Sequence, residues 1–169
     1  GARPYFGRSP LEHVVYLMPH APATALAAAE HALTAVGRRF SPVRQKQLRI
    51  TFENEPGRTL TKLRSGRVDG LLIDARGAGG QACEKLLPEL FPVHALAEVV
   101  GRDRTWLVVD GTEAKSAELC FRAGQLRLAG VIPAHAGELW VAVFEQLTET
   151  LNKTRGGKVA LCLAGGGIE

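Results

Sequence analysis

Two short runs of apolar residues, each ending in an aspartate, constrain the fold of this chain more than any other feature. The first run is Leu71–Ile73, which is followed by Asp74. The second is Thr105–Val109, which is followed by Asp110 and Gly111. Continuous apolar runs of this length do not suit a sheet with one face in water, so we interpret both as strands covered on both faces. In open α/β sheets the chemistry lies at the carboxyl ends of such strands, which makes Asp74 the first candidate residue.

Segments with strand and helix patterns alternate along the chain. Strands are expected at His13–Met18, Leu48–Phe52, Leu71–Ile73, Thr105–Val109, Leu128–Ile132 and Lys158–Leu163. Helices are expected at Ala23–Val36, Arg58–Arg64, Gln81–Gly101 with a break at Pro88 and Pro92, Thr112–Arg122 and Gly137–Asn152. Right-handed crossovers would build one open parallel sheet with helices on both faces, which is a flavodoxin-like α/β fold. Because Leu48–Phe52 alternates apolar and polar residues, we place it at an edge, and the strand order becomes 2-1-3-4-5.

The composition indicates one globular, soluble domain. The chain has 169 residues, 46% of them hydrophobic, and no apolar run approaches the roughly 18 to 20 residues of a membrane span. Its cysteines, Cys83, Cys120 and Cys162, are odd in number and far apart, so we expect buried, reduced thiols and a cytoplasmic location. No two histidines stand at metal-ligand spacing, and we predict neither a metal site nor a cofactor.

The charge of the chain is mildly basic. The formal net charge is +4, and basic residues cluster between Arg38 and Arg49. A nucleic-acid reader usually interleaves aromatic residues for stacking, but only Phe40 and Phe52 lie in this region. We therefore interpret the cluster as a solvated face and expect no nucleic-acid partner, with binding of anionic lipid or nucleic acid as the alternative.

Residues 13–152 resemble a response-regulator receiver domain. L-L-I-D-A-R-G looks like the third strand of that family, with the phosphate-accepting aspartate at Asp74. The segments V-V-D-G-T-E-A-K and A-G-V-I-P-A-H-A-G-E-L-W resemble the ends of the fourth and fifth strands. A working receiver also needs an acidic pair after its first strand, because the Mg²⁺ held there neutralises the phosphoryl oxygens during transfer. Those positions are Met18, Pro19 and His20 in this chain.

Two further positions depart from the receiver pattern. Asp110 replaces the hydroxyl residue of the fourth strand, and Ile132, before Pro133, replaces the lysine of the fifth. The resemblance therefore implies a receiver-like domain that is not phosphorylated, in which Asp74 caps or bonds a loop. A phosphorylatable receiver is the alternative.

A second resemblance concerns ligand binding. R-T-L-T-K-L-R-S-G-R-V-D-G-L-L-I-D is similar to ligand-binding domains of transcriptional regulators and periplasmic receptors. This resemblance implies a small-ligand sensor of the same fold class. Such a sensor would need a polar pocket at the strand ends around Asp74, Asp110 and His135.

The end of the chain, K-V-A-L-C-L-A-G-G-G-I-E, resembles the opening strand and glycine-rich loop of patatin-like phospholipases. In that family the backbone N–H groups of this loop form the oxyanion hole, a role that the resemblance gives to Gly165, Gly166 and Gly167. The family's nucleophile lies in a G-x-S-x-G motif, and this sequence contains none. We therefore predict no catalytic residue in the chain itself.

Together these patterns predict four segments: an N-terminal extension (1–12), a receiver-like domain (13–152), a linker (153–157) and the start of a patatin-like domain (158–169). The expected function is that of a non-catalytic regulatory or interaction domain of a bacterial-type patatin-like phospholipase, a lipid acyl hydrolase. Its expected partners are its own catalytic domain and a second copy in a homodimer, with membrane lipid reached only through the parent enzyme. We expect the strand Val159–Leu163 to pair beside Leu128–Ile132 or with the same segment of another molecule.

Overall fold

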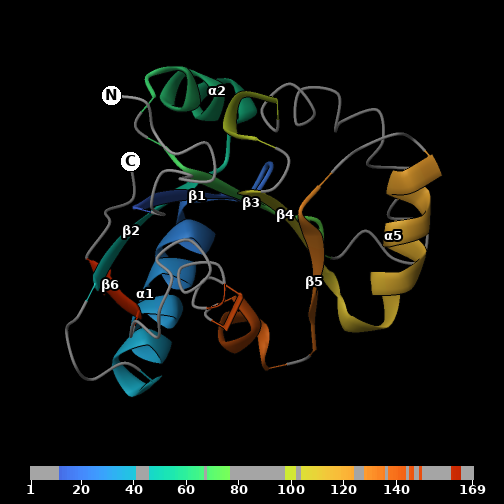
Figure 1. Ribbon diagram of the computed structural model, residues 1–169. Coiled ribbons are helices and arrows are strands. Elements are labelled where there is room, and N and C mark those ends of the chain that lie inside the picture. Colours follow the sequence, from blue (N-terminus) through green and yellow to red (C-terminus); the bar gives the residue numbers. More distant parts are fainter. Residues whose placement is uncertain are drawn as a thin grey trace.

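The protein folds around a parallel β-sheet with helices on both faces, as the computed structural model shows (Figure 1). The structure describes residues 12–40, 46–66, 68–76, 98–101, 104–123, 128–135, 137–143, 145–146, 149 and 161–164. The strands within these ranges are β1 (His13–Leu17), β2 (Lys46–Glu53), β3 (Gly70–Asp74), β4 (Thr105–Asp110), β5 (Gly130–Ala134) and β6 (Leu161–Ala164). The described helices are α1 (Ala23–Phe40), α2 (Pro56–Arg64), the 3₁₀ turn η3 (Gly111–Glu113), α5 (Ala114–Ala123), and helical residues at 98–100, 139–143, 145–146 and 149.

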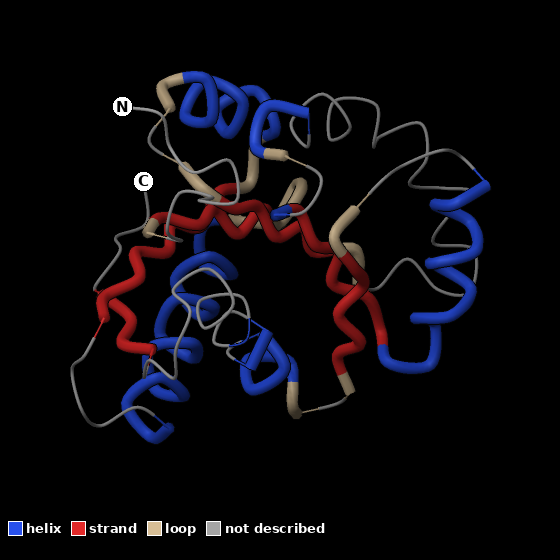
Figure 2. Tube along the Cα trace, viewed as in Figure 1, coloured by secondary structure: helices blue, strands red, loops and turns tan. Residues whose placement is uncertain are grey.

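The order of the strands is β5-β4-β3-β1-β2-β6, and every neighbouring pair is parallel. This arrangement confirms the flavodoxin-like order 2-1-3-4-5 and adds β6 outside β2. The central position of β3 is also confirmed, because its first four residues are buried and it pairs with β1 on one side and β4 on the other. Figure 2 shows the strands as one continuous twisted layer between helices.

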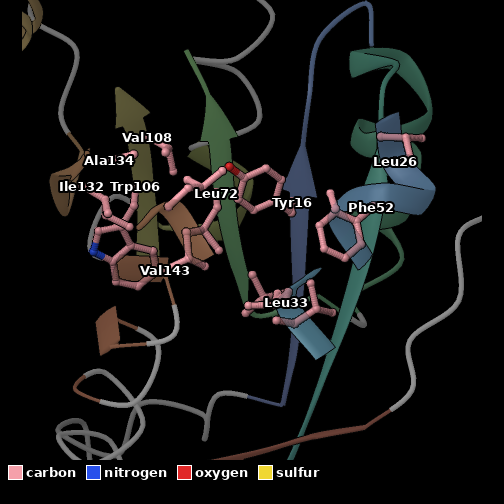
Figure 3. Close-up of a cluster of buried hydrophobic side chains, with 14 residues drawn as sticks. Tyr16, Leu26, Leu33, Phe52, Leu72, Trp106, Val108, Ile132, Ala134 and Val143 are labelled. Carbon is pink, nitrogen blue, oxygen red and sulfur yellow. The ribbon is translucent and has the colours of Figure 1, made fainter. Parts of the chain in front are cut away.

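Each face of the sheet carries its own apolar core. One core joins alternate strand residues to α1 and to the helix after β5, and its members include Tyr16, Leu33, Phe52, Leu72, Trp106 and Val143 (Figure 3). The other core joins the opposite strand residues to α2 and α5, and its members include Val15, Leu17, Leu63, Ile73, Leu107 and Ala117. Successive side chains of a strand point to opposite faces, so strands that are apolar at every position need both layers of helices.

The helix boundaries differ from the predicted ones by a few residues, and the helix predicted at Thr112–Arg122 is the turn η3 followed by α5. α1 continues to Phe40, past the predicted end at Val36. α2 begins at Pro56, two residues before the predicted start, because proline lacks an N–H group and suits the first turn of a helix. Gly66, with a φ of 76°, then turns the chain away from α2 toward β3.

The predicted edge position of β2 is wrong, and so is the predicted site of pairing for the last strand. β6 pairs with residues Lys46 to Arg49 of β2, and not beside β5. β5 is five residues long and contains Pro133, which has no N–H group to offer a further strand, whereas β2 is eight residues long. The domain boundary predicted before residue 158 remains a prediction. Residues 1–11 and 150–160 lie outside the described ranges.

The polar residues on one face of β2 are not all in solvent: Arg49 is exposed, but the two that follow it on this face are buried. Thr51 and Glu53 are fully buried. The Glu53 carboxylate pairs with Lys62 Nζ at 2.5 Å and with Arg58 Nε at 3.5 Å, and both cations belong to α2. Thr51 Oγ1 lies 2.6 Å from His13 Nε2. Toward the carboxyl end of β2 the alternation therefore reflects a buried polar layer and not contact with solvent.

The ion pair between Glu53 and Lys62 predicts a measurable change in stability. Lys62→Met should lower the free energy of unfolding by about 1–3 kcal/mol, because it leaves the buried carboxylate without its closest cation. Adding Glu53→Leu should restore most of the loss, since two apolar side chains leave no charge to bury. Urea denaturation measures both effects.

Lys115→Met is the matched control, because Lys115 is exposed on α5. It should change the stability by less than about 0.5 kcal/mol. A Lys62→Met variant as stable as this control would contradict the prediction.

Candidate functional site

Asp74 lies at the carboxyl end of the central strand, and its carboxylate is fully engaged with its neighbours. Oδ1 accepts hydrogen bonds from the backbone N–H of Arg76 at 3.0 Å and from Arg76 Nε at 3.0 Å. Oδ2 accepts from Arg76 Nη2 at 2.8 Å, from Arg76 Nε at 3.1 Å and from the Tyr16 hydroxyl at 3.1 Å. Asp74 thus bonds the loop that follows it, which is a common use of aspartate in turns.

The chain geometry brings these three residues together. Ala75 donates its backbone N–H to Val108 O at 2.7 Å, which extends the pairing of β3 with β4 by one residue. The chain turns at Arg76, so the guanidinium folds back onto the carboxylate two residues earlier. Tyr16 pairs in register with Leu72, and Leu72 and Asp74 point to the same face of the sheet. The Tyr16 hydroxyl therefore reaches Asp74 on the face of the sheet that also carries Leu72.

Tyr16 is a buried and neutral donor. Its ring packs against Phe52 at 5.5 Å and against Trp140 at 5.3 Å between centroids. Figure 3 shows the ring between Phe52 and Leu72. Burial, followed by the charge of Asp74, raises the pKa of Tyr16 well above its usual value. The hydroxyl thus keeps its proton and donates a hydrogen bond to Asp74.

Arg76 is the cation of the site. Its Nε and Nη2 atoms face the carboxylate side by side, which is the geometry of a strong charge-assisted pair. The hydrogen bond to Asp74 raises the pKa of Arg76, and the nearby Asp110 adds to this effect. The side chain of Asp74 is 7% exposed, whereas that of Arg76 is 33% exposed and extends into open space.

That open space is a pocket of about 280 Å³ at the carboxyl ends of β3, β4 and β5. It is lined by Arg76, Asp110, Gly111, Thr112, Ala134, His135, Gly137 and Leu139. The structure therefore brings together Asp110 and His135, the two residues expected to form a pocket, from the ends of β4 and β5. Asp74 adjoins the pocket through Arg76 and is not among the lining residues.

The His135 ring lies directly on the backbone of Gly111. A Cβ atom at Gly111 would stand 2.3 Å from Nδ1 and 2.4 Å from Cε1 of His135, so only glycine permits this approach. The chain then turns sharply, since Glu138 N donates to His135 O at 2.9 Å and Gly137 has a φ of 79°. These contacts hold the imidazole at the mouth of the pocket.

The end of β1 differs from the pattern of a receiver with a metal site. Met18 packs against the core and donates its N–H to Glu53 O at 2.7 Å. His20 has a φ of 64° and donates its N–H to Asn54 O at 3.1 Å. Among the described residues no three histidine, cysteine or acidic side chains stand close enough to hold a metal ion.

Several predicted features lie outside what the structure describes. They are the oxyanion-loop candidates Gly165, Gly166 and Gly167, the side chains of Cys83, Cys120 and Cys162, and the basic side chains from Arg38 to Lys46. Two residues of the site were not predicted. They are Arg76 and Tyr16. The spacing of Asp74 and Arg76 in D-A-R could have indicated a local ion pair. Nothing in the apolar run around Tyr16, however, indicates that its hydroxyl donates a hydrogen bond to Asp74.

Comparison with known proteins adds no family: no protein-family model, curated protein or solved structure matches the chain. No described helix has the length and apolar character needed to cross a membrane. The fold and the site geometry are therefore the basis for any functional argument.

The raised pKa of Tyr16 predicts that this phenol ionises only at a pH well above the usual value for tyrosine. The chain has two tyrosines, so Tyr5→Phe leaves Tyr16 as the one phenol to follow by ultraviolet absorbance. The folded variant should show no phenolate near pH 10, whereas the urea-unfolded variant should ionise at about that pH. A raised folded pKa stabilises the native state below about pH 10, and this stability is lost as the pH rises further. Ionisation of Tyr16 near pH 10 in the folded variant would refute the buried hydrogen bond.

Proposed function

We propose that this chain is a regulatory domain with a receiver-like fold that works without phosphoryl transfer. The engagement of Asp74 carries the proposal. An aspartate that accepts a phosphoryl group must present an oxygen to the donor in line with the leaving group. Both oxygens of Asp74 instead accept bonds from Arg76 and Tyr16.

The surroundings of Asp74 support the same proposal. Met18, Pro19 and His20 follow β1 where a working receiver has its acidic pair, so no carboxylate at those positions can hold Mg²⁺ for the developing charge. Arg76 supplies a fixed cation, but its pairing geometry favours the carboxylate over an incoming phosphoryl group. The negative charge of Asp74 is thus already neutralised by Arg76.

The link to a lipid acyl hydrolase is part of the proposal and derives from residues 158–169. Their resemblance to the opening of a patatin-like domain suggests that the regulated partner is a catalytic domain in the same polypeptide. A homodimer is the second proposed partner arrangement. Pairing of β6 with β2 inside one sheet means that such a dimer would use a surface other than an unpaired β6.

The proposal predicts that phosphate donors do not modify Asp74. Incubation with acetyl phosphate, or with beryllofluoride, in the presence of Mg²⁺ should leave the mass and the NMR spectrum of the protein unchanged. The reason is that the attacking oxygen is engaged and the metal has no acidic pair to bind. A stoichiometric mass increase that disappears in Asp74→Asn would overturn the proposal.

The proposal also predicts that this chain does not hydrolyse short acyl esters. Backbone donors can stabilise an oxyanion by about 3 kcal/mol, but an acyl-enzyme cannot form without a nucleophile and a base. Hydrolysis of a chromogenic butyrate ester should stay at the rate of the buffer. Turnover that survives repurification and is blocked by a serine-directed phosphonate would reveal a nucleophile and contradict the proposal.

Small-ligand sensing is a second candidate, and the pocket between Arg76, Asp110 and His135 favours it. The pocket lies at the carboxyl ends of parallel strands, where α/β folds of this type bind ligands. It combines polar groups with an apolar wall from Ala134 and Leu139. Sensing and regulation are compatible, because a bound ligand could provide the signal that phosphorylation provides elsewhere.

A further inference from the structure

We propose that α2 is a cover that opens and closes as one unit while the sheet and α1 remain folded. α2 lies over β1 and β2, on the opposite face of the sheet from α1 (Figure 1). The inference goes beyond the function proposed above and does not depend on it, because the groups that hold α2 are separate from the site around Asp74.

The apolar contact that holds α2 is small. Among the described residues, Leu63 is the one buried apolar side chain of this helix, and Leu60 is partly buried. The other buried residue, Thr59, uses its hydroxyl to bond a backbone carbonyl four residues earlier at 2.9 Å. The longer helix α1 buries three apolar side chains, namely Leu26, Ala29 and Leu33. Burial of apolar surface therefore holds α2 less firmly than α1.

An ion pair joins α2 to β2. The fully buried Glu53 carboxylate pairs with Lys62 Nζ and with Arg58 Nε of α2. A buried ion pair contributes little net stability, because the cost of removing its charges from water offsets much of their attraction. When α2 opens, Glu53 and Lys62 are hydrated again. Opening of α2 is therefore less costly than opening of a helix that is held by an apolar face of the same size.

The chain is fixed just outside both ends of α2. Before the helix, Asn54 Nδ2 donates to Ala21 O at 2.7 Å, and Asn54 O accepts from His20 N at 3.1 Å. After the helix, Asp69 Oδ2 accepts from His13 N at 3.0 Å, and Asp69 N donates to His13 O at 2.7 Å. α2 can therefore move between these two points without breaking the pairing of β1 with β2 and β3.

Opening uncovers the face of the sheet beneath α2. The register places Val15 beside Thr51 and Leu17 beside Glu53 on this face. Val15 and Leu17 belong to the same apolar core as Leu63, and both are fully buried while α2 is closed. The open form thus presents an apolar strip with a carboxylate beside it. A regulatory domain can signal through such a change of surface.

The test is amide hydrogen exchange of the whole chain, followed by NMR. Residues 59–65 carry the amides of α2 and its last turn, and residues 71–73 carry those of the central strand. Opening as a unit should give the α2 amides similar protection factors, at least about tenfold below those of the strand. Equal protection in α2 and the strand would overturn the inference. A steady fall in protection from the middle of α2 to its ends would also overturn it, because that pattern is fraying.

Leu33→Ala separates local opening from global unfolding. Leu33 is buried against the other face of the sheet, so its truncation weakens the fold equally with α2 open or closed. Protection of residues 71–73 should fall at least about tenfold, and that of α2 should stay within about twofold. Leu33→Val makes the same comparison, with a fall of about threefold in the strand, if the alanine variant does not fold. A parallel loss of protection in α2 would show that α2 opens only when the whole protein unfolds.

Lys62→Met tests the part played by the ion pair. It removes the closest cation of Glu53 in the closed form, where the carboxylate is buried, and matters little in the open form, where water solvates the carboxylate. Protection of all α2 amides should therefore fall together, by at least about fivefold. Adding Glu53→Leu should bring it back to within about threefold of the native value.

Lys115→Met is again the matched control, because this lysine is exposed on α5. It should leave the protection of α2 unchanged. If Lys62→Met also leaves it unchanged, the ion pair does not hold the cover closed and the inference is refuted. The phosphate-donor experiment is independent of these results, since it examines Asp74 and not α2.

Discussion

Parallel pairing on both sides of β3 is the constraint on which the rest of the structure depends. A strand with parallel neighbours on both sides has both faces covered by crossover helices, so it is apolar along its whole length. Parallel pairing also brings the carboxyl ends of β1, β3, β4 and β5 to one edge of the sheet. Polar residues that follow these strands meet there whatever their separation in sequence, as the pocket between Arg76, Asp110 and His135 shows.

Most of the fold could be predicted because its strands and helices have clear periodicities. The runs around Leu72 and Val108 have no polar face, which indicated their central position directly. The edge prediction for β2 failed because β6 pairs outside it. Its premise of an exposed face failed as well: Thr51 and Glu53 are polar yet fully buried, and α2 supplies Lys62 to neutralise the carboxylate. A periodicity rule treats a polar residue as exposed, and it has no means of anticipating a buried partner from the next helix.

The candidate site could be predicted only in part. Asp110 and His135 were recognisable because they follow strands whose ends must converge. Tyr16 was not recognisable, because its hydrogen bond to Asp74 depends on the register that pairs Tyr16 with Leu72. Arg76 follows Asp74 by two residues in the sequence. Whether its guanidinium points toward the carboxylate, however, depends on the turn that the chain takes after β3. Contacts set by register and turn geometry are a property of the folded chain.

The same arrangement fits the proposal that Asp74 takes no part in phosphoryl transfer. A carboxylate used as a nucleophile needs a free oxygen and a nearby metal, whereas a carboxylate used as an anchor needs donors on both oxygens. Arg76 and Tyr16 provide those donors, and the burial of Tyr16 keeps its proton in place. Once Asp74 is committed to holding Arg76, the cation becomes the group that faces the pocket. At this strand end Arg76 is thus the residue that lines the pocket, and Asp74 is the residue that holds it in place.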